Sequence, residues 1–87
     1  VEKSSSLKAK KWLGSLYHNL GQAYDEAGLY EDCLKTTECC LKIREQEGYL
    51  PNIRVAKWAL GRALRHLNRV HEALKIQRTL LDEYESM

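Results

Sequence analysis

The chain has 87 residues, and its 14 basic and 12 acidic side chains leave a formal net charge of only +2. This near-neutral balance gives no overall signature of nucleic-acid binding, and the length allows one small domain with a limited core. No apolar run approaches the roughly 18 residues of a membrane span, and no apolar signal segment stands at the N-terminus. We therefore expect a soluble, cytoplasmic segment of a larger protein, without a membrane partner.

Residues 1–6 are polar and rich in serine, and we expect them to be disordered. From Leu7 onward, apolar residues recur at intervals of three and four, which predicts a first helix over residues 7–27. Gly28 follows as the left-handed residue that commonly ends a helix. The positions that carry the helical pattern are Leu13, Leu16, Tyr17, Leu20, Ala23, Tyr24 and Ala27.

The same spacing predicts a second helix over residues 30–46, with acidic residues suitably placed in its first turn. Residues 47–51 form the expected linker. Gly48 can stop the second helix there, and Pro51 can occupy the first turn of the next one.

A third helix is predicted over residues 52–67 and a fourth over residues 70–85. Asn68 stands between them, and asparagine tolerates the left-handed conformation that Gly28 supplies in the first turn. No strand pattern competes with these helices, so the sequence predicts an all-α fold.

Two parts of the chain resemble each other at a spacing of 40 residues. Inside the helices, Gly21 and Gly61 each cost about 1 kcal/mol relative to alanine. We therefore expect these glycines to let paired helices approach closely, with Cys33 and Ala73 opposite them. The aligned pairs are Leu20 with Leu60, Gly21 with Gly61, Ala23 with Ala63, Gly28 with Asn68, Tyr30 with Val70, Cys33 with Ala73, Leu34 with Leu74, and Leu41 with Leu81.

The repeated residues resemble the signature of tetratricopeptide (TPR) repeats. The resemblance covers roughly residues 14–84, and the 40-residue spacing exceeds the usual length of about 34, as in the longer repeats of kinesin light chains. It implies two helix-turn-helix hairpins, over residues 7–46 and 52–85, in a short right-handed α-solenoid. Two positions depart from the pattern, since Lys57 replaces an aromatic residue and Cys33 a small one. Signature positions in the first repeat are Tyr17, Leu20, Gly21, Tyr24, Gly28, Tyr30, Cys33, Cys40 and Leu41, and in the second Leu60, Gly61, Ala63, Leu64, Val70, Ala73, Leu80 and Leu81.

The resemblance also implies a concave groove, lined by the first helix of each hairpin, that binds a peptide or a segment of a partner protein. Trp58 lies roughly 160° from Leu60 around its helix, off the core stripe, where a tryptophan is a common binding anchor. The residues expected to bind the partner are His18, Asn19, Gln22, Trp58, Arg62, Arg65 and His66, and Asp25, Glu26, Val55 and Ala59 also take groove positions.

The resemblance indicates the chemistry of the ligand. Asn19 stands where the family often holds a ligand backbone, and Arg62 stands at a frequent carboxylate-binding position. His18 and Ala59 depart from the complete carboxylate clamp of the family. We expect a protein or peptide ligand that is acidic or ends in a free carboxylate, since an arginine fork matches carboxylate geometry.

We expect no enzyme activity, cofactor or metal. Cys33, Cys39 and Cys40 lie on one predicted helix without a Cys-x-x-Cys pair, and free cysteines fit a reducing compartment. None of the three histidines has a neighbouring nucleophile in a recognised catalytic pattern.

Three other interactions stay open. Residues 52–71 carry five basic residues and no acidic one, so this helix is a candidate for nucleic-acid binding. The repeats could instead only pack on neighbouring repeats. Apolar residues also remain on the last helix beyond a single stripe, which favours a homodimer of the isolated segment. The basic residues are Arg54, Lys57, Arg62, Arg65 and Arg69, and the apolar ones are Ile76, Leu80, Leu81 and Tyr84.

Overall fold

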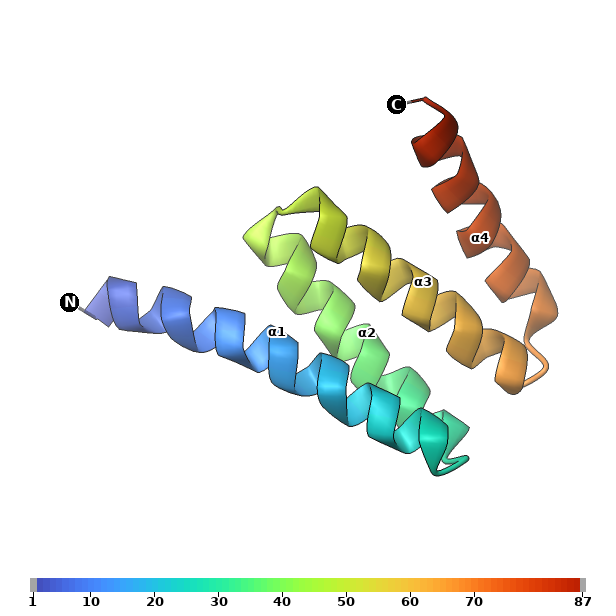
Figure 1. Ribbon diagram of the computed structural model, residues 1–87, viewed down its shortest axis with the longest axis horizontal. Coiled ribbons are helices and arrows are strands. Elements are labelled where there is room, and N and C mark those ends of the chain that lie inside the picture. The colour runs from blue at the N-terminus through green and yellow to red at the C-terminus, as the bar shows by residue number, and fades with distance from the viewer. Residues whose placement is uncertain (1, 87) are drawn as a thin grey trace.

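The computed structural model describes the backbone of residues 2–86 and the side chains of residues 12–86. Within that backbone range it contains four α-helices and no strand, which confirms the all-α prediction (Figure 1). The helices are α1 (Glu2–Glu26), α2 (Tyr30–Glu47), α3 (Leu50–His66) and α4 (Val70–Glu85).

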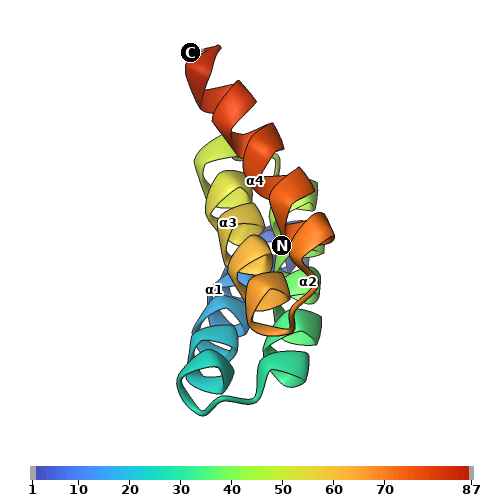
Figure 2. The ribbon, with the colours of Figure 1, turned by 90° about the vertical axis from the view of Figure 1, so that its right-hand side faces the viewer.

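Each helix packs mainly against the next one in the chain, so α2 lies between α1 and α3, and α3 lies between α2 and α4 (Figure 1). The molecule is flat, with extents of 45 × 35 × 14 Å. In the view along the layer, much of α1 and α3 lies toward one side and much of α2 toward the other (Figure 2). The two outer helices, α1 and α4, therefore lie at opposite ends of the layer.

The two hairpin turns have the same backbone structure. This confirms the prediction that Gly28 and Asn68 adopt the left-handed conformation. Gly28 has a φ of 76° and Asn68 a φ of 61°, and Asn68 is the one non-glycine residue of the described backbone with positive φ. These residues let the chain reverse while the last carbonyl groups of each first helix remain hydrogen-bonded. The matching bonds, from N–H to carbonyl, are Leu29 to Tyr24 and Arg69 to Leu64 (both 2.9 Å), and Gly28 to Asp25 (3.1 Å) and Asn68 to Arg65 (3.0 Å).

Two predicted boundaries are wrong. The helix α1 begins at Glu2, so residues 2–6 are helical and not disordered, while Val1 lies outside the described residues. The segment before Leu7 consists of glutamate, lysine and serine, and it contains no glycine or proline that would break the helix. The expected linker over residues 47–51 is also shorter, because α2 continues to Glu47 and α3 already begins at Leu50. Pro51 is tolerated in the first turn of α3, where its missing N–H has no helical partner.

The core is small and lies between α2, α3 and α4. Its five buried residues include two alanines and a cysteine, so the helix axes come close together. Partly buried side chains from α1, α3, the turn after α3, and α4 pack around this cluster. The buried residues are Cys33, Leu34, Ala63, Leu64 and Ala73, and the surrounding ones are Tyr24, Leu60, Leu67 and Ile76.

The unusual Lys57 forms an ion pair between α3 and α4. Its Nζ lies 3.5 Å from Glu83 Oε1. In the first hairpin, Tyr17 and Ile43 take these two positions. A charged pair in the second hairpin thus replaces an aromatic and an apolar residue.

The glycines inside α1 and α3 meet other residues than those predicted. Both are buried, but a methyl group on Gly21 would lie 3.3 Å from Thr37 Oγ1, and one on Gly61 would lie 3.4 Å from Gln77 Cγ. The prediction that Cys33 and Ala73 stand opposite is therefore wrong by one helical turn. The contacts themselves keep the 40-residue register, because Thr37 and Gln77 are equivalent positions.

Alanine at these glycines is expected to have unequal effects. Gly61→Ala should raise the free energy of unfolding by about 0.5 to 1 kcal/mol, since alanine favours a helix and the flexible Gln77 side chain can move. Gly21→Ala should gain nothing, because the buried Thr37 hydroxyl is held by a 2.7 Å bond to the Cys33 carbonyl. Urea unfolding of both variants checks this, and equal gains would contradict it.

Candidate functional site

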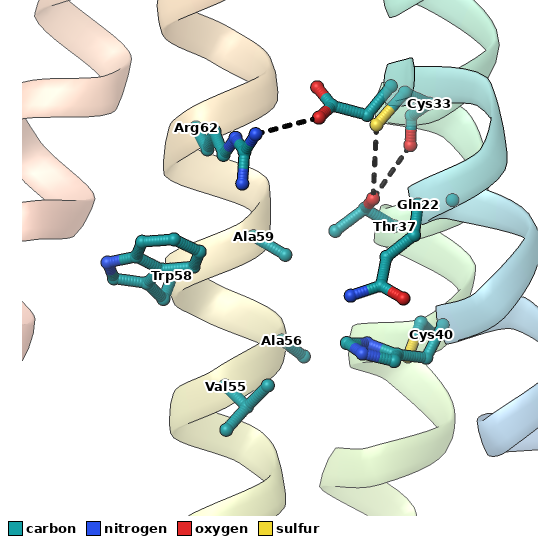
Figure 3. Close-up of a pocket in the computed structure, with 12 residues that line it drawn as sticks. Gln22, Cys33, Thr37, Cys40, Val55, Ala56, Trp58, Ala59 and Arg62 are labelled. Carbon is teal, nitrogen blue, oxygen red and sulfur yellow. Dashed lines mark hydrogen bonds and ion pairs between the residues drawn. The ribbon is translucent and has the colours of Figure 1, made fainter. Parts of the chain in front are cut away.

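A cleft opens between α1 and α3, with α2 as its floor, and we call it the α1/α3 cleft (Figure 3). Its volume is about 190 Å³. A smaller hollow continues from it along the start of α3 and shares His18, Cys40, Val55 and Ala56 with it. The site is thus elongated along the helices. The residues that line the α1/α3 cleft are His18, Gly21, Gln22 and Asp25 from α1, Cys33, Thr37 and Cys40 from α2, and Val55, Ala56, Trp58, Ala59 and Arg62 from α3.

The polar groups of the floor are bonded within the protein. The Thr37 hydroxyl donates to the Cys33 carbonyl at 2.7 Å, and the Cys40 thiol lies 3.5 Å from the Gly14 carbonyl, to which it donates (Figure 3 shows the first bond). Burial raises the pKa of both thiols, Cys33 and Cys40, above the ordinary value. The floor is therefore a neutral surface of small side chains.

Two polar side chains on α1 are open to a ligand. Neither His18 nor Gln22 makes a side-chain hydrogen bond or ion pair to any other side chain or backbone group within residues 12–86. In Figure 3 the amide of Gln22 points into the cleft toward α3. An amide offers both donors and an acceptor, which suits the alternating N–H and C=O groups of a peptide backbone.

One end of the cleft is closed by a charged cluster around Asp25. Its carboxylate forms an ion pair with Arg62, with 3.0 Å between Oδ2 and Nη2, and its Oδ1 lies 3.6 Å from His66 Nε2. The His66 ring stacks on Tyr30 with 4.5 Å between ring centroids. The guanidinium of Arg62 also lies 5.9 Å from the Trp58 ring centroid. Because Asp25 balances Arg62, the cleft has no uncompensated arginine charge.

Trp58 stands at the outer edge of the cleft, on the side of α3 away from Gln22 (Figure 3). Its side chain is 53% exposed. It also lines a second cleft, about 400 Å³ in volume, which we call the α3/α4 cleft. Trp58 and Val55 thus form a ridge between the two clefts. The residues of the α3/α4 cleft are Arg54, Val55, Trp58, Gln77, Leu80, Leu81 and Tyr84.

The structure brings together four of the seven predicted binding residues, namely His18, Gln22, Trp58 and Arg62. Asn19 does not line the cleft, because it follows His18 and points about 100° further around the helix. Arg65 and His66 lie beyond Arg62, and the Asp25 cluster separates His66 from the cleft.

The sequence analysis missed the floor residues and the pairing of Asp25. Cys33, Thr37 and Cys40 belong to α2 and follow its core stripe, so their pattern is that of ordinary buried residues. Asp25 was predicted at a groove position, without an ion-pair partner. Its pairing with Arg62 depends on the position of α1 relative to α3, which no local pattern records.

The basic stretch of α3 is largely neutralised. Arg54 and Lys57 both lie within 4 Å of Glu83, at 3.8 and 3.5 Å, while Arg62 pairs with Asp25. Arg69, in the following turn, pairs with Glu72. Four of the five basic residues considered for phosphate contacts thus already have acidic partners, which does not favour nucleic-acid binding.

The three thiols are expected to differ in reactivity. Cys39 is exposed, whereas Cys33 and Cys40 are buried and have raised pKa values. Iodoacetamide should therefore modify Cys39 first, and the other two at least about a hundredfold more slowly, because they react only after local opening. Peptide mass spectrometry against time checks this, with urea-unfolded protein as the control. Equal native rates at Cys33 and Cys39 would contradict the buried assignment.

The described side chains contain no group of three histidine, cysteine or acidic residues placed to hold a metal ion. Over the described backbone, none of the helices combines the length and apolar character that crossing a membrane requires. Comparison of the chain with protein-family models, with curated proteins and with solved structures finds no match.

Proposed function

We propose that this chain is a two-hairpin segment of TPR type that binds an extended peptide in the α1/α3 cleft, within a larger protein. The observation that carries the proposal is the cleft itself, in which two open polar side chains line an elongated hollow and an exposed tryptophan stands at its outer edge. Tryptophan is enriched among the residues that dominate binding energy. The resemblance to TPR repeats is supported by the equivalent hairpin turns at a 40-residue spacing.

The ligand suited to this cleft has a peptide backbone and one apolar side chain. The Gln22 amide and His18 ring are placed to bond the backbone, and the face of Trp58 with Val55 and Ala59 accepts the apolar group. The small floor residues leave depth for that side chain.

A carboxylate on the ligand would approach Arg62. The arginine side chain is 47% exposed and uses one nitrogen, Nη2, for Asp25, so other N–H groups remain available. Asp25 reduces the attraction, because a second carboxylate must share the guanidinium with it. We therefore propose an acidic or C-terminal carboxylate as a secondary contact, added to the apolar anchor.

The test is selection from a random peptide library displayed with free C-termini. Recovered peptides are synthesised with a free acid or an amide at the C-terminus, and their affinities are measured by fluorescence anisotropy. We expect peptides with an aromatic or aliphatic residue, and a loss of about three- to tenfold on amidation.

The position of the bound peptide is read from amide chemical shifts of the labelled protein. The expected changes include Gln22, Ala59 and the Trp58 indole. A library that returns no binder, or peptides that shift only residues outside the α1/α3 cleft, would reject the proposed function.

A further inference from the structure

The two ends of the helical layer present different apolar faces. On α4 the open face contains Leu74, Leu81 and Tyr84, all about half exposed. On α1 it contains Leu16 and Leu20, with 61% and 44% exposure. Fewer apolar side chains of α4 are exposed than the sequence predicted, because Leu80 is buried and Ile76 packs against the core.

The open face of α4 is the counterpart of a face of α2 that is covered. In the 40-residue register, Leu74 corresponds to Leu34, which is only 4% exposed against 48% for Leu74. The difference arises because α3 packs on α2, whereas nothing in the described chain packs on the equivalent face of α4. A second pair in this register is Leu41, which is half-buried, with Leu81, which is exposed.

The open face of α1 is the counterpart of the α3 face that covers α2. Ala56 is 2% exposed, and its equivalent Leu16 is 61% exposed. The other members of this set in α3 and the turn after it contact or belong to the core cluster, whereas their equivalents in α1 and the turn after it are exposed. The pairs are Ala56 with Leu16, Leu60 with Leu20, Ala63 with Ala23, and Leu67 with Ala27.

The α3/α4 cleft corresponds to the α1/α3 cleft but is walled by fewer helices. Four of its residues are equivalent to His18, Thr37, Cys40 and Arg44, which line the α1/α3 cleft or its adjoining hollow. In the first hairpin, α3 supplies the third wall of that site. The second hairpin has the first two walls, α3 and α4, and no helix of the described residues takes the place of the third.

The end of α4 and the start of α1 carry opposite charges. The helix α3 begins where α2 ends, because only Gly48 and Tyr49 join them. An equivalent arrangement would set the start of α1 beside the end of α4. The end of α4 carries the acidic residues Asp82 and Glu85, beside the Glu83 that pairs with Arg54 and Lys57, and the start of α1 is basic in sequence, with Lys3, Lys8, Lys10 and Lys11. Opposite charges there favour the contact.

We propose that α1 of one copy of this chain packs against α4 of a second copy, in the register in which α3 packs against α2. The contact joins two different faces, so it is head-to-tail. The two faces belong to the outer helices at opposite ends of the layer, so each contact leaves one free face of each kind, to which further copies can add. This open-ended contact differs from the homodimer predicted from the sequence, and it is independent of peptide binding.

The test uses the 87-residue chain and two variants at exposed positions. Leu81→Glu spoils the α4 face and leaves α1 intact, whereas Leu16→Glu spoils the α1 face and leaves α4 intact. Each should weaken association by about a hundredfold or more, because a carboxylate would be buried without a partner. Circular dichroism verifies folding, and Leu74→Glu and Leu20→Glu form a second pair if either variant loses helicity.

Sedimentation velocity gives the result. The unchanged chain should grow in mass with concentration without stopping at a dimer. Each variant alone should be a monomer, and an equal mixture should form a one-to-one dimer through the two intact faces. A monomeric unchanged chain would overturn the proposal. So would a two-fold dimer, in which one variant alone still dimerises, or a mixture that stays monomeric.

Discussion

Replacing Leu34 by alanine is expected to lower the free energy of unfolding by about 3 kcal/mol. The side chain is 4% exposed and belongs to the central cluster, so its removal loses buried apolar contacts and leaves a cavity beside Leu64. A domain of this size has a total stability of only about 5 to 10 kcal/mol. The variant should therefore be substantially unfolded at a urea concentration that the unchanged chain tolerates.

The matched control is Leu74→Ala, at the equivalent position of the second hairpin. Residue type, helix and register position correspond, but Leu74 is 48% exposed. Its replacement should cost less than about 1 kcal/mol. Urea unfolding at low protein concentration, where association contributes least, measures both values. Equal losses at Leu34 and Leu74 would show that the two hairpins are covered alike, contrary to this structure.

Replacing Trp58 by alanine is expected to weaken the selected peptides at least tenfold, about 1.4 kcal/mol of binding free energy. Trp58 lines the outer edge of the α1/α3 cleft with an exposed aromatic ring, and the Arg62 guanidinium lies 5.9 Å from the centroid of that ring. Because the side chain is already half exposed, its removal should change the stability of the fold little. Fluorescence anisotropy gives the affinity, and urea unfolding gives the stability.

Arg62→Ala and Arg65→Ala provide a comparison within one helix. Arg62 lines the cleft, whereas Arg65 is exposed beyond its end. The first change should weaken carboxylate-bearing peptides and the second should leave them within about twofold, since a solvated charge outside the site contributes little. If Arg65→Ala has the larger effect, or Trp58→Ala binds like the unchanged chain, the peptide lies elsewhere.

The local structure of the chain is readable from its sequence. Apolar residues spaced by three and four predict all four helices, since a helix buries one face and this period follows from its geometry. Gly28 and Asn68 mark both turns, because few residue types adopt a left-handed backbone at low cost. The start of α1 was predicted too late because a polar, serine-containing segment can be helical or disordered, and no strong signal separates the two.

The candidate site follows only in part from local pattern. The exposure of Trp58 is predictable because the residue lies off the apolar stripe of its own helix. The pairing of Asp25 with Arg62 is not, since 37 positions separate them and they meet only because α1 and α3 both pack on α2. The burial of a side chain also depends on residues far away in the sequence. Leu34 and Leu74 have equivalent sequence positions, yet one is buried and the other open, because a following helix covers the first and not the second.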